Sequence, residues 1–239
     1  MARAATAKAK RAPGKAKRRA KPKPDPRPWW LWTLAFLAAF LAVRLAVNAA
    51  ELVPVHFDEA QYWAYGQELA WGYFSKPPLV GAAIRLTTDL FGDTLFALRI
   101  ASPVAHALVA WLIFATARRL FDGRTGFGAA VGYTAAPGVG VSSMIVSTDP
   151  IMMVFWGLAL YGTVRAREGG APWWALVGAA IGAGMLAKYT MVAFAVGLLG
   201  WVMLSAERRD WRGLGIAALA ALVVFSPNLL WNLQNGFAT

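Results

Sequence analysis

The stretch WWLWTLAFLAAFLAVRLAVNAA, residues 29–50, holds a single charged side chain, Arg44. About twenty apolar residues in a helix, each rising about 1.5 Å, cross the roughly 30 Å of hydrocarbon in a bilayer. Trp29 and Trp30 open the stretch, as aromatic side chains do at a membrane interface, and Arg44 can extend its guanidinium toward the other interface. No small-residue cleavage site follows, so the stretch predicts a first transmembrane helix that is retained.

The composition places the rest of the chain in the same class. The 239 residues are 58% hydrophobic and 15% charged, with a mean hydropathy of +0.47, which is more apolar surface than one soluble core can bury. No cysteine occurs, so the sequence offers neither a disulfide nor a thiolate ligand or nucleophile. We therefore expect an all-α polytopic membrane protein.

The formal charge of +12 comes mostly from residues 1–28, which hold 11 of the 24 Lys and Arg and one of the 12 acids. The other 211 residues carry 13 basic and 11 acidic side chains, about +2. Alternating prolines that end at Pro28 prevent a helix, so we predict a disordered cytoplasmic tail. The tail could bind RNA or a partner protein. Beside a membrane, however, we expect it to fix the topology and to contact anionic lipid, with no nucleic-acid partner.

Six further apolar runs follow the first and make a predicted total of about seven transmembrane helices, in a domain that covers residues 29–239. Arginines collect in alternate loops, as the positive-inside rule requires of the cytoplasmic side. The acids of residues 51–94 and Asp149 fall in the opposite loops. The predicted later spans are 95–117, 126–146, 151–166, 172–187, 190–206 and 212–233, and the arginines are Arg118, Arg119, Arg124, Arg165, Arg167, Arg208, Arg209 and Arg212.

Residues 51–94 form the long first loop outside the cytoplasm and are expected to contain two amphipathic interfacial helices. Asp58 can cap a helix of about 59–71, which Gly72 would end in a left-handed conformation. Pro77 and Pro78 then keep the backbone extended. The second helix, about 79–91, would carry an Arg85–Asp89 pair and five apolar residues on separate sides, before Gly92 ends it. Those apolar residues are Leu79, Ala82, Ala83, Leu86 and Leu90.

Four charged residues of this loop and its neighbours are candidates for chemistry. Asp58 and Glu59 could simply start a helix, but a carboxylate pair directly after a span, beside His56, also suits a general base and a hydroxyl or metal ligand. Lys76 could neutralise nearby acids, or bind an anionic headgroup from a backbone stiffened by prolines. Asp149 fits an ordinary Asp-Pro turn, yet it lies on the same membrane side as Asp58.

Lys188 stands between two short apolar runs, where a lysine is costly and often functional; otherwise it is an interfacial turn residue. His106 is expected to be a packed histidine with one hydrogen bond, and no second histidine lies at metal-ligand spacing from it. No glycine motif cradles a nucleotide, so no nucleotide cofactor is expected, whereas a divalent metal stays open. Gly178, Gly182 and Gly184 predict close helix packing.

Six motifs occur together in one order, and together they resemble the membrane glycosyltransferases of type-C fold. Within these, the chain is similar to the group of dolichyl-phosphate-mannose protein mannosyltransferases and lipid A aminoarabinose transferases, over about residues 29–239. The motifs are the first span, Phe-Asp-Glu-Ala-Gln-Tyr-Trp (57–63), Gly-Tyr-Phe-Ser-Lys-Pro-Pro-Leu (72–79), Ser-Thr-Asp-Pro (147–150), Leu-Ala-Lys-Tyr-Thr (186–190) and Ser-Pro-Asn-Leu-Leu-Trp-Asn (226–232).

The resemblance implies inverting transfer of a sugar from a polyprenyl-phosphate donor to a lipid, glycan or protein acceptor. The active site would face outward from a membrane, which we expect to be the bacterial inner membrane. It implies that Asp58 is the base, that Glu59 contacts sugar or acceptor, and that Lys76 and Lys188 approach the donor phosphate. Asp149 would line the same cavity, and Tyr62 and Tyr189, within the matching motifs, would contact substrate.

Members of the group usually have more than ten spans, so the chain is expected to be truncated. A transporter or flippase of lipid-linked substrates is the alternative, although the broken repeated helices typical of transporters are not evident.

Overall fold

The computed structural model describes residues 27–204 and 210–239, and within these ranges every regular element is a helix. The extended pairing found there is an isolated bridge between Tyr73 and Lys76. The prediction of an all-α protein is therefore confirmed for this part of the chain. The predicted tail of residues 1–28, except for its last two residues, lies outside the described ranges, and so do Arg208 and Arg209.

Most of the helices follow one another with short connections, and the longest one within the described ranges is residues 68–78, between α2 and α3. Their bounds are α1 (Trp29–Ala49), α2 (Phe57–Gln67), α3 (Leu79–Phe91), α4 (Leu95–Arg99), α5 (Ala101–Leu120), α6 (Gly123–Thr134), α7 (Pro137–Ser142), α8 (Thr148–Gly169), α9 (Ala171–Ala187), the 3-10 turn η1 (Tyr189–Met191), α10 (Val192–Leu204) and α11 (Trp211–Gln234).

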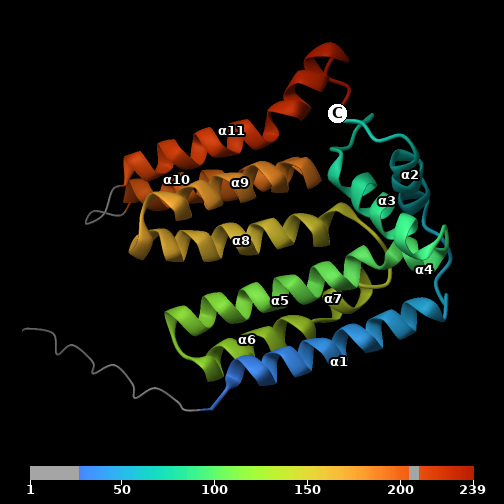
Figure 1. Ribbon diagram of the computed structural model, residues 1–239, viewed down its shortest axis with the longest axis horizontal. Coiled ribbons are helices and arrows are strands. Elements are labelled where there is room, and N and C mark those ends of the chain that lie inside the picture. The colour runs from blue at the N-terminus through green and yellow to red at the C-terminus, as the bar shows by residue number, and fades with distance from the viewer. Residues whose placement is uncertain (1–26, 205–209) are drawn as a thin grey trace, which may run out of the picture.

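The long helices run roughly side by side, while α2, α3 and α4 gather at one end of them (Figure 1). The most extensive helix pairs are α9 with α11, α8 with α9, α5 with α6 and α5 with α8. Helix α3 contacts α2 and α4 and also reaches α5, α8 and α9. The segment 51–94 therefore caps the end of the bundle at which α8 begins and α9 finishes.

Three helices of the described residues are long and apolar enough to cross a membrane. They are Trp29–Ala49, Leu95–Leu120, which takes α4 and α5 together, and Trp211–Gln234. Two shorter apolar helices, Ala171–Ala187 and Tyr189–Leu204, lie between them. The count of seven spans stays a prediction. The prediction of one span over 126–146 was wrong as a single helix, because Pro137 begins a new helix after a break at Ala135 and Ala136.

The predicted close packing at glycines is confirmed where α9 crosses α11. A Cβ built on Gly178 would overlap the carbonyl group of Ala217, and one on Gly182 would lie 2.6 Å from the carbonyl oxygen of Ala221. Only glycine lets these two backbones approach so closely. Gly184 likewise faces Met191 with no room for a Cβ.

The two helices of the 51–94 segment match the sequence predictions unequally. Helix α3 has the predicted bounds and its Arg85–Asp89 pair at 2.8 Å, and Gly92 ends it at φ +87°. Its apolar face, however, is only partly covered by protein, since Leu86 and Leu90 are exposed. The buried residues of α3 are instead Val80, Gly81, Ile84, Thr87 and Thr88.

Helix α2 differs at both ends from the prediction. His56, not Asp58, is its N-cap, and it ends at Gln67, followed by Glu68 in an extended conformation. Gly72 is not left-handed. It is buried against the indole of Trp231, where a Cβ would collide with the ring. Gly72 is therefore needed for a close approach of α11, not for ending a helix.

Candidate active site

The start of α2 leaves the carboxylate of Asp58 uncommitted. The Nδ1 atom of His56 accepts from the backbone N–H of Asp58 at 3.3 Å, and the backbone N–H of His56 donates to Glu59 Oε2 at 3.0 Å. This reciprocal capping box satisfies the helix end without the Asp58 side chain. The ionisable side chain next to Asp58 is that of His56, whose Nδ1 lies 3.9 Å from Oδ2. Asp58 is about one-third exposed, so its carboxylate can accept a proton from an outside group.

Glu59 lies at the centre of a buried ion pair with Arg99. Both side chains are 1% exposed, and the guanidinium donates to both carboxylate oxygens, from Nε to Oε1 at 2.9 Å and from Nη2 to Oε2 at 2.7 Å. The backbone N–H of Val146 adds a third donor to Oε1 at 2.9 Å. With the N–H of His56, four hydrogen bonds reach this carboxylate. Glu59 therefore has no free surface to offer a substrate in this structure.

Arg99 extends the same network to the segment before α2. Its Nη1 donates to the carbonyl oxygen of Val53 and its Nη2 to that of Pro54, both at 2.9 Å. One arginine thus joins the 53–56 segment to α4, and through Glu59 to the loop at Val146. The sequence analysis missed Arg99, although a lone arginine five residues into an apolar run is a recognised signal of function.

Burial and hydrogen bonding act in opposite directions on Glu59. Burial by itself raises the pKa of the carboxyl, but the hydrogen bonds from Arg99 and from the backbone of His56 and Val146, with the charge of Arg99, bring that pKa below its ordinary value. Glu59 is therefore ionised at neutral pH, and the pair carries balanced charges.

Lys76 is held above the ring of Tyr62. Its Nζ lies 5.5 Å from the ring centroid, and Tyr62 follows Asp58 by four residues on the same face of α2. Lys76 makes no ion pair within the residues that the structure describes, so its ammonium is available to an anion. The structure thus places the Lys76 ammonium over Tyr62, one helical turn from Asp58, and Tyr62 is 2% exposed beneath the cation.

The backbone around Lys76 is fixed from two sides. Tyr73 and Lys76 exchange backbone hydrogen bonds, and Ser75 between them has a φ of +65°. The C-terminal residues hold this turn from outside, since the N–H of Ser75 donates to the carbonyl oxygen of Ala238 at 2.9 Å and the hydroxyl of Thr239 donates to that of Tyr73 at 2.9 Å. Lys76 therefore lies outside helical geometry, as expected of the residue before two prolines.

Asp149 and Lys188 pair with each other. The Nζ of Lys188 lies 2.7 Å from Oδ1 and 2.9 Å from Oδ2 of Asp149. Asp149 is the second residue of α8 instead of a free turn, and Lys188 sits where α9 gives way to η1. The start of α8 and the end of α9 lie at the end of the bundle where α2 and α3 gather (Figure 1). No hydrogen bond or ion pair within residues 27–204 and 210–239 joins them to Asp58 or Lys76.

Tyr189 belongs to a network that anchors α11 to the 51–94 segment. Its hydroxyl donates to Asn228 Oδ1 at 2.7 Å and accepts from Asn232 Nδ2 at 3.2 Å. Asn228 also donates to the carbonyl oxygen of Trp71 at 2.6 Å. The sequence analysis assigned no role to either asparagine, yet two amides one helical turn apart inside an apolar helix could have indicated an interhelical contact.

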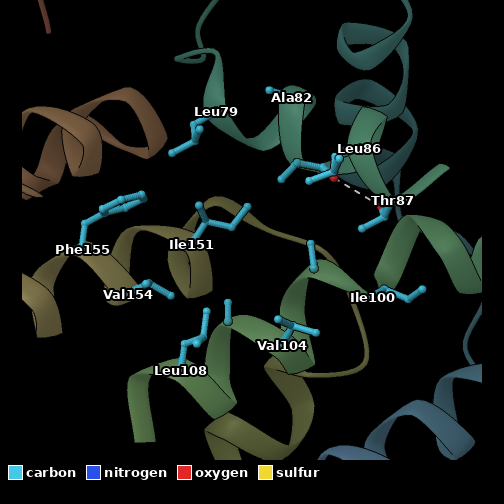
Figure 2. A pocket seen from close by; sticks show the side chains of 13 residues that line it. Leu79, Ala82, Leu86, Thr87, Ile100, Val104, Leu108, Ile151, Val154 and Phe155 are labelled. Atoms are coloured by element: carbon cyan, nitrogen blue, oxygen red, sulfur yellow. Dashed lines mark hydrogen bonds between the residues drawn. The ribbon is translucent and has the colours of Figure 1, made fainter. Parts of the chain in front are cut away.

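An apolar groove adjoins this end of the bundle. It lies between α3, α5 and α8, has a volume of about 530 Å³, and is shown in Figure 2. Thr87 supplies its hydroxyl, which already bonds to the carbonyl oxygens of Ala83 and Ile84. Leu79 and Ile151 line it three residues after Lys76 and two after Asp149. The groove is therefore suited to an alkyl chain whose polar end lies near those two charged groups.

No group of three or more potential metal-ligating side chains occurs among the described residues. His106 is buried, and its Nδ1 lies 2.8 Å from the hydroxyl of Tyr133. The prediction of a packed histidine with one hydrogen bond is confirmed.

Comparison with known proteins supplies the family. The sequence profile described as dolichyl-phosphate-mannose-protein mannosyltransferase matches residues 75–231. Lipid A galacturonosyltransferase RgtD of Rhizobium johnstonii is 34% identical over 216 residues, which are 86% of this chain and 44% of that protein. Undecaprenyl phosphate-alpha-4-amino-4-deoxy-L-arabinose arabinosyl transferase of Pseudomonas paraeruginosa is 35% identical over 189 residues, covering 72% of this chain and 32% of that one. The chain thus spans less than half the length of these relatives.

A solved structure agrees with this at the level of the fold. The crystal structure of ArnT from Cupriavidus metallidurans in the apo state superposes with a TM-score of 0.71, at 22% identity, over 85% of this chain and 43% of that one. At this identity the likeness concerns the arrangement of helices alone.

Proposed function

Because the chain belongs to the dolichyl-phosphate-mannose-protein mannosyltransferase family, we propose that it takes part in moving a sugar from a polyprenyl-phosphate carrier to a lipid acceptor. The observation that carries the proposal is the uncommitted carboxylate of Asp58, one helical turn before Tyr62, over whose ring the Lys76 ammonium lies without an ion pair among the described residues; Asp58 and Lys76 belong to a segment held by a buried ion pair. The two relatives described above are named for lipid A and for an undecaprenyl-phosphate sugar, which favours that acceptor and that donor.

Asp58 is the base in this proposal. An acceptor hydroxyl attacks the anomeric carbon from the side opposite the phosphate, its proton passes to the Asp58 carboxylate, and the carbon–oxygen bond to the phosphate breaks with its electron pair. The anomeric configuration is inverted. Lys76 approaches the leaving phosphate, whose charge grows as the bond breaks, and a fixed cation stabilises that change more than it stabilises the bound donor.

The other site residues take roles that follow from their contacts. Glu59 positions the Asp58 segment through Arg99. It does not touch the sugar in this proposal, because its oxygens are buried and already accept hydrogen bonds. Tyr62 supports Lys76 from below, and Asp149 holds Lys188, which can turn to the donor phosphate when an anion competes for it. The apolar groove receives part of a lipid chain.

The arrangement also supports an orientation in the membrane. The arginines at the end of α5 lie at the opposite end of the bundle from α2 and α3 (Figure 1). By the positive-inside rule, Asp58 and Lys76 then face outward from the cytoplasm, as the predicted spans on either side of the 51–94 loop also require. In a bacterial cell this is the periplasmic face of the inner membrane. No observation favours the transporter or flippase alternative.

The test is sugar transfer from a labelled undecaprenyl-phosphate donor to lipid A by the full-length protein. Asp58→Asn keeps the size of the side chain but cannot take up a proton, so turnover should fall by about 10²-fold or more while donor binding persists. Asp89→Asn removes a carboxylate of the same segment that is paired with Arg85, and it should leave turnover near that of the wild type. Near-normal transfer by Asp58→Asn would rule out the proposed base.

A further inference from the structure

A second cavity lies at the far end of the bundle from the candidate active site, between the last turns of α5 and α8. Its volume is about 680 Å³. Apolar side chains of Trp111, Leu112 and Leu158 line one part of it, and charged side chains of Arg118, Arg119 and Glu168 line another. A cavity with one apolar and one basic side, at the end of membrane helices, matches the two halves of a phospholipid.

Among the described residues, the positive charges at this cavity outnumber the negative ones. Arg119 forms an ion pair with Glu168 across the two helices. Arg118 is exposed and makes no ion pair or hydrogen bond with residues 27–204 or 210–239; its guanidinium lies only 5.9 Å from the ring centroid of Phe114. Two guanidiniums thus face one carboxylate at the rim of the cavity.

A third arginine lies just behind the rim. Arg165 donates from Nη1 to the hydroxyl of Tyr161, a lining residue, at 3.4 Å and stacks on Trp173 at 4.3 Å. Its Nε is buried and has no hydrogen-bond partner among the described residues. An unpaired buried guanidinium nitrogen is unusual, and it adds a further positive charge that would attract an anion to the cavity.

We propose that this cavity binds an anionic phospholipid, with its phosphate between Arg118 and Arg119 and an acyl chain against Trp111 and Leu158. Arginine binds phosphate oxygens through paired N–H donors, which gives geometry as well as charge. A zwitterionic lipid would bring an ammonium group to the same arginines and lose that advantage. The site is separate from the sugar-transfer site, so it does not depend on the proposed activity or on which leaflet it faces.

The test is a lipid titration of the purified chain in a neutral detergent, with bound lipids counted by native mass spectrometry. Wild type should bind phosphatidylglycerol more tightly than phosphatidylcholine. Arg118→Gln should weaken phosphatidylglycerol binding about fivefold, the effect of one arginine near an anionic headgroup, and should leave phosphatidylcholine binding unchanged. Glu168→Gln removes the competing carboxylate and should strengthen phosphatidylglycerol binding, whereas a purely structural Arg119–Glu168 bridge predicts a loss.

Arg124→Gln is the matched control, because Arg124 is exposed in the first turn of α6, outside the cavity, and carries the same charge. It should bind both lipids as the wild type does. Equal binding of the two lipids by the wild type would overturn the proposal. So would an equal loss in Arg118→Gln and Arg124→Gln, which would indicate diffuse attraction instead of a site, or a loss of phosphatidylglycerol binding in Glu168→Gln.

Discussion

Replacing Arg99 by Met should be among the most damaging single changes outside the reacting groups. It deletes four hydrogen bonds, two to Glu59 and two to the carbonyl oxygens of Val53 and Pro54, and leaves the Glu59 carboxylate buried without its counter-ion. Breaking a buried ion pair from one side typically costs about 3–5 kcal/mol, since the remaining charge keeps its desolvation cost. We expect a loss of free energy of unfolding of that size.

Arg85→Met is the matched control, because Arg85 pairs with Asp89 at 2.8 Å with both side chains exposed. Screening by solvent limits an exposed pair of this kind to about 0.3–0.5 kcal/mol. Unfolding of the full-length protein would be followed by circular dichroism in mixed detergent micelles as the fraction of denaturing detergent rises. If Arg99→Met costs no more than Arg85→Met, the buried Arg99–Glu59 pair does not stabilise the segment.

A double variant separates stability from positioning. In Arg99→Met/Glu59→Met both charges are gone, and two apolar side chains of similar size fill the same volume, which often restores stability. Transfer should nevertheless stay low, because nothing then ties the segment at Pro54 to the loop at Val146. Full transfer activity in a restored double variant would contradict the role of the pair in positioning Asp58.

Three further predictions follow from the same contacts. The pKa of Glu59 is lower in the folded protein than its unfolded value of about 4.5, so its ionised form stabilises the fold above that value. This stability is lost as pH falls through the lower folded pKa. Unfolding titrations from about pH 5 to about pH 3 should show the loss in the wild type and not in the double variant. Lys76→Gln should weaken donor binding by more than the ~1 kcal/mol of an exposed ion pair, as measured by calorimetry, and an unchanged affinity would remove Lys76 from the donor site. A cysteine at Ser75 should react with an impermeant thiol reagent on intact cells and one at Gly123 should not; the reverse pattern would refute the proposed orientation.

Much of the helical architecture could be read from the sequence because its causes are local. The apolar run that opens at Trp29 and the spacing of α3 with its Arg85–Asp89 pair depend on residues within a few turns of one another. The predicted start of α2 was wrong, and the reason is also local. His56 is the N-cap instead of Asp58, because Glu59 completes the capping box with His56.

Of the candidate site, the sequence indicated the residues but not their partners. Asp58 and Lys76 were selected from charge and setting, and the structure adds that the Lys76 ammonium lies over the ring of Tyr62, one helical turn after Asp58. The pairing of Asp149 with Lys188 joins residues 39 positions apart, which no helical or turn period relates. Asn228 was overlooked because an amide inside an apolar helix shows its purpose only through the group it meets.

The sequence by itself determined that this chain is a helical membrane protein, where most of its helices lie, and which side of the membrane its acids are expected to face. Those properties follow from hydrophobicity, helix length and charge, which add up along the chain. Only the tertiary structure decided that Glu59 is a structural anchor and Asp58 the available carboxylate. That difference arises from Arg99, 40 residues away, and Val146, 87 residues away, because desolvation and hydrogen bonding depend on neighbours in space and not in sequence.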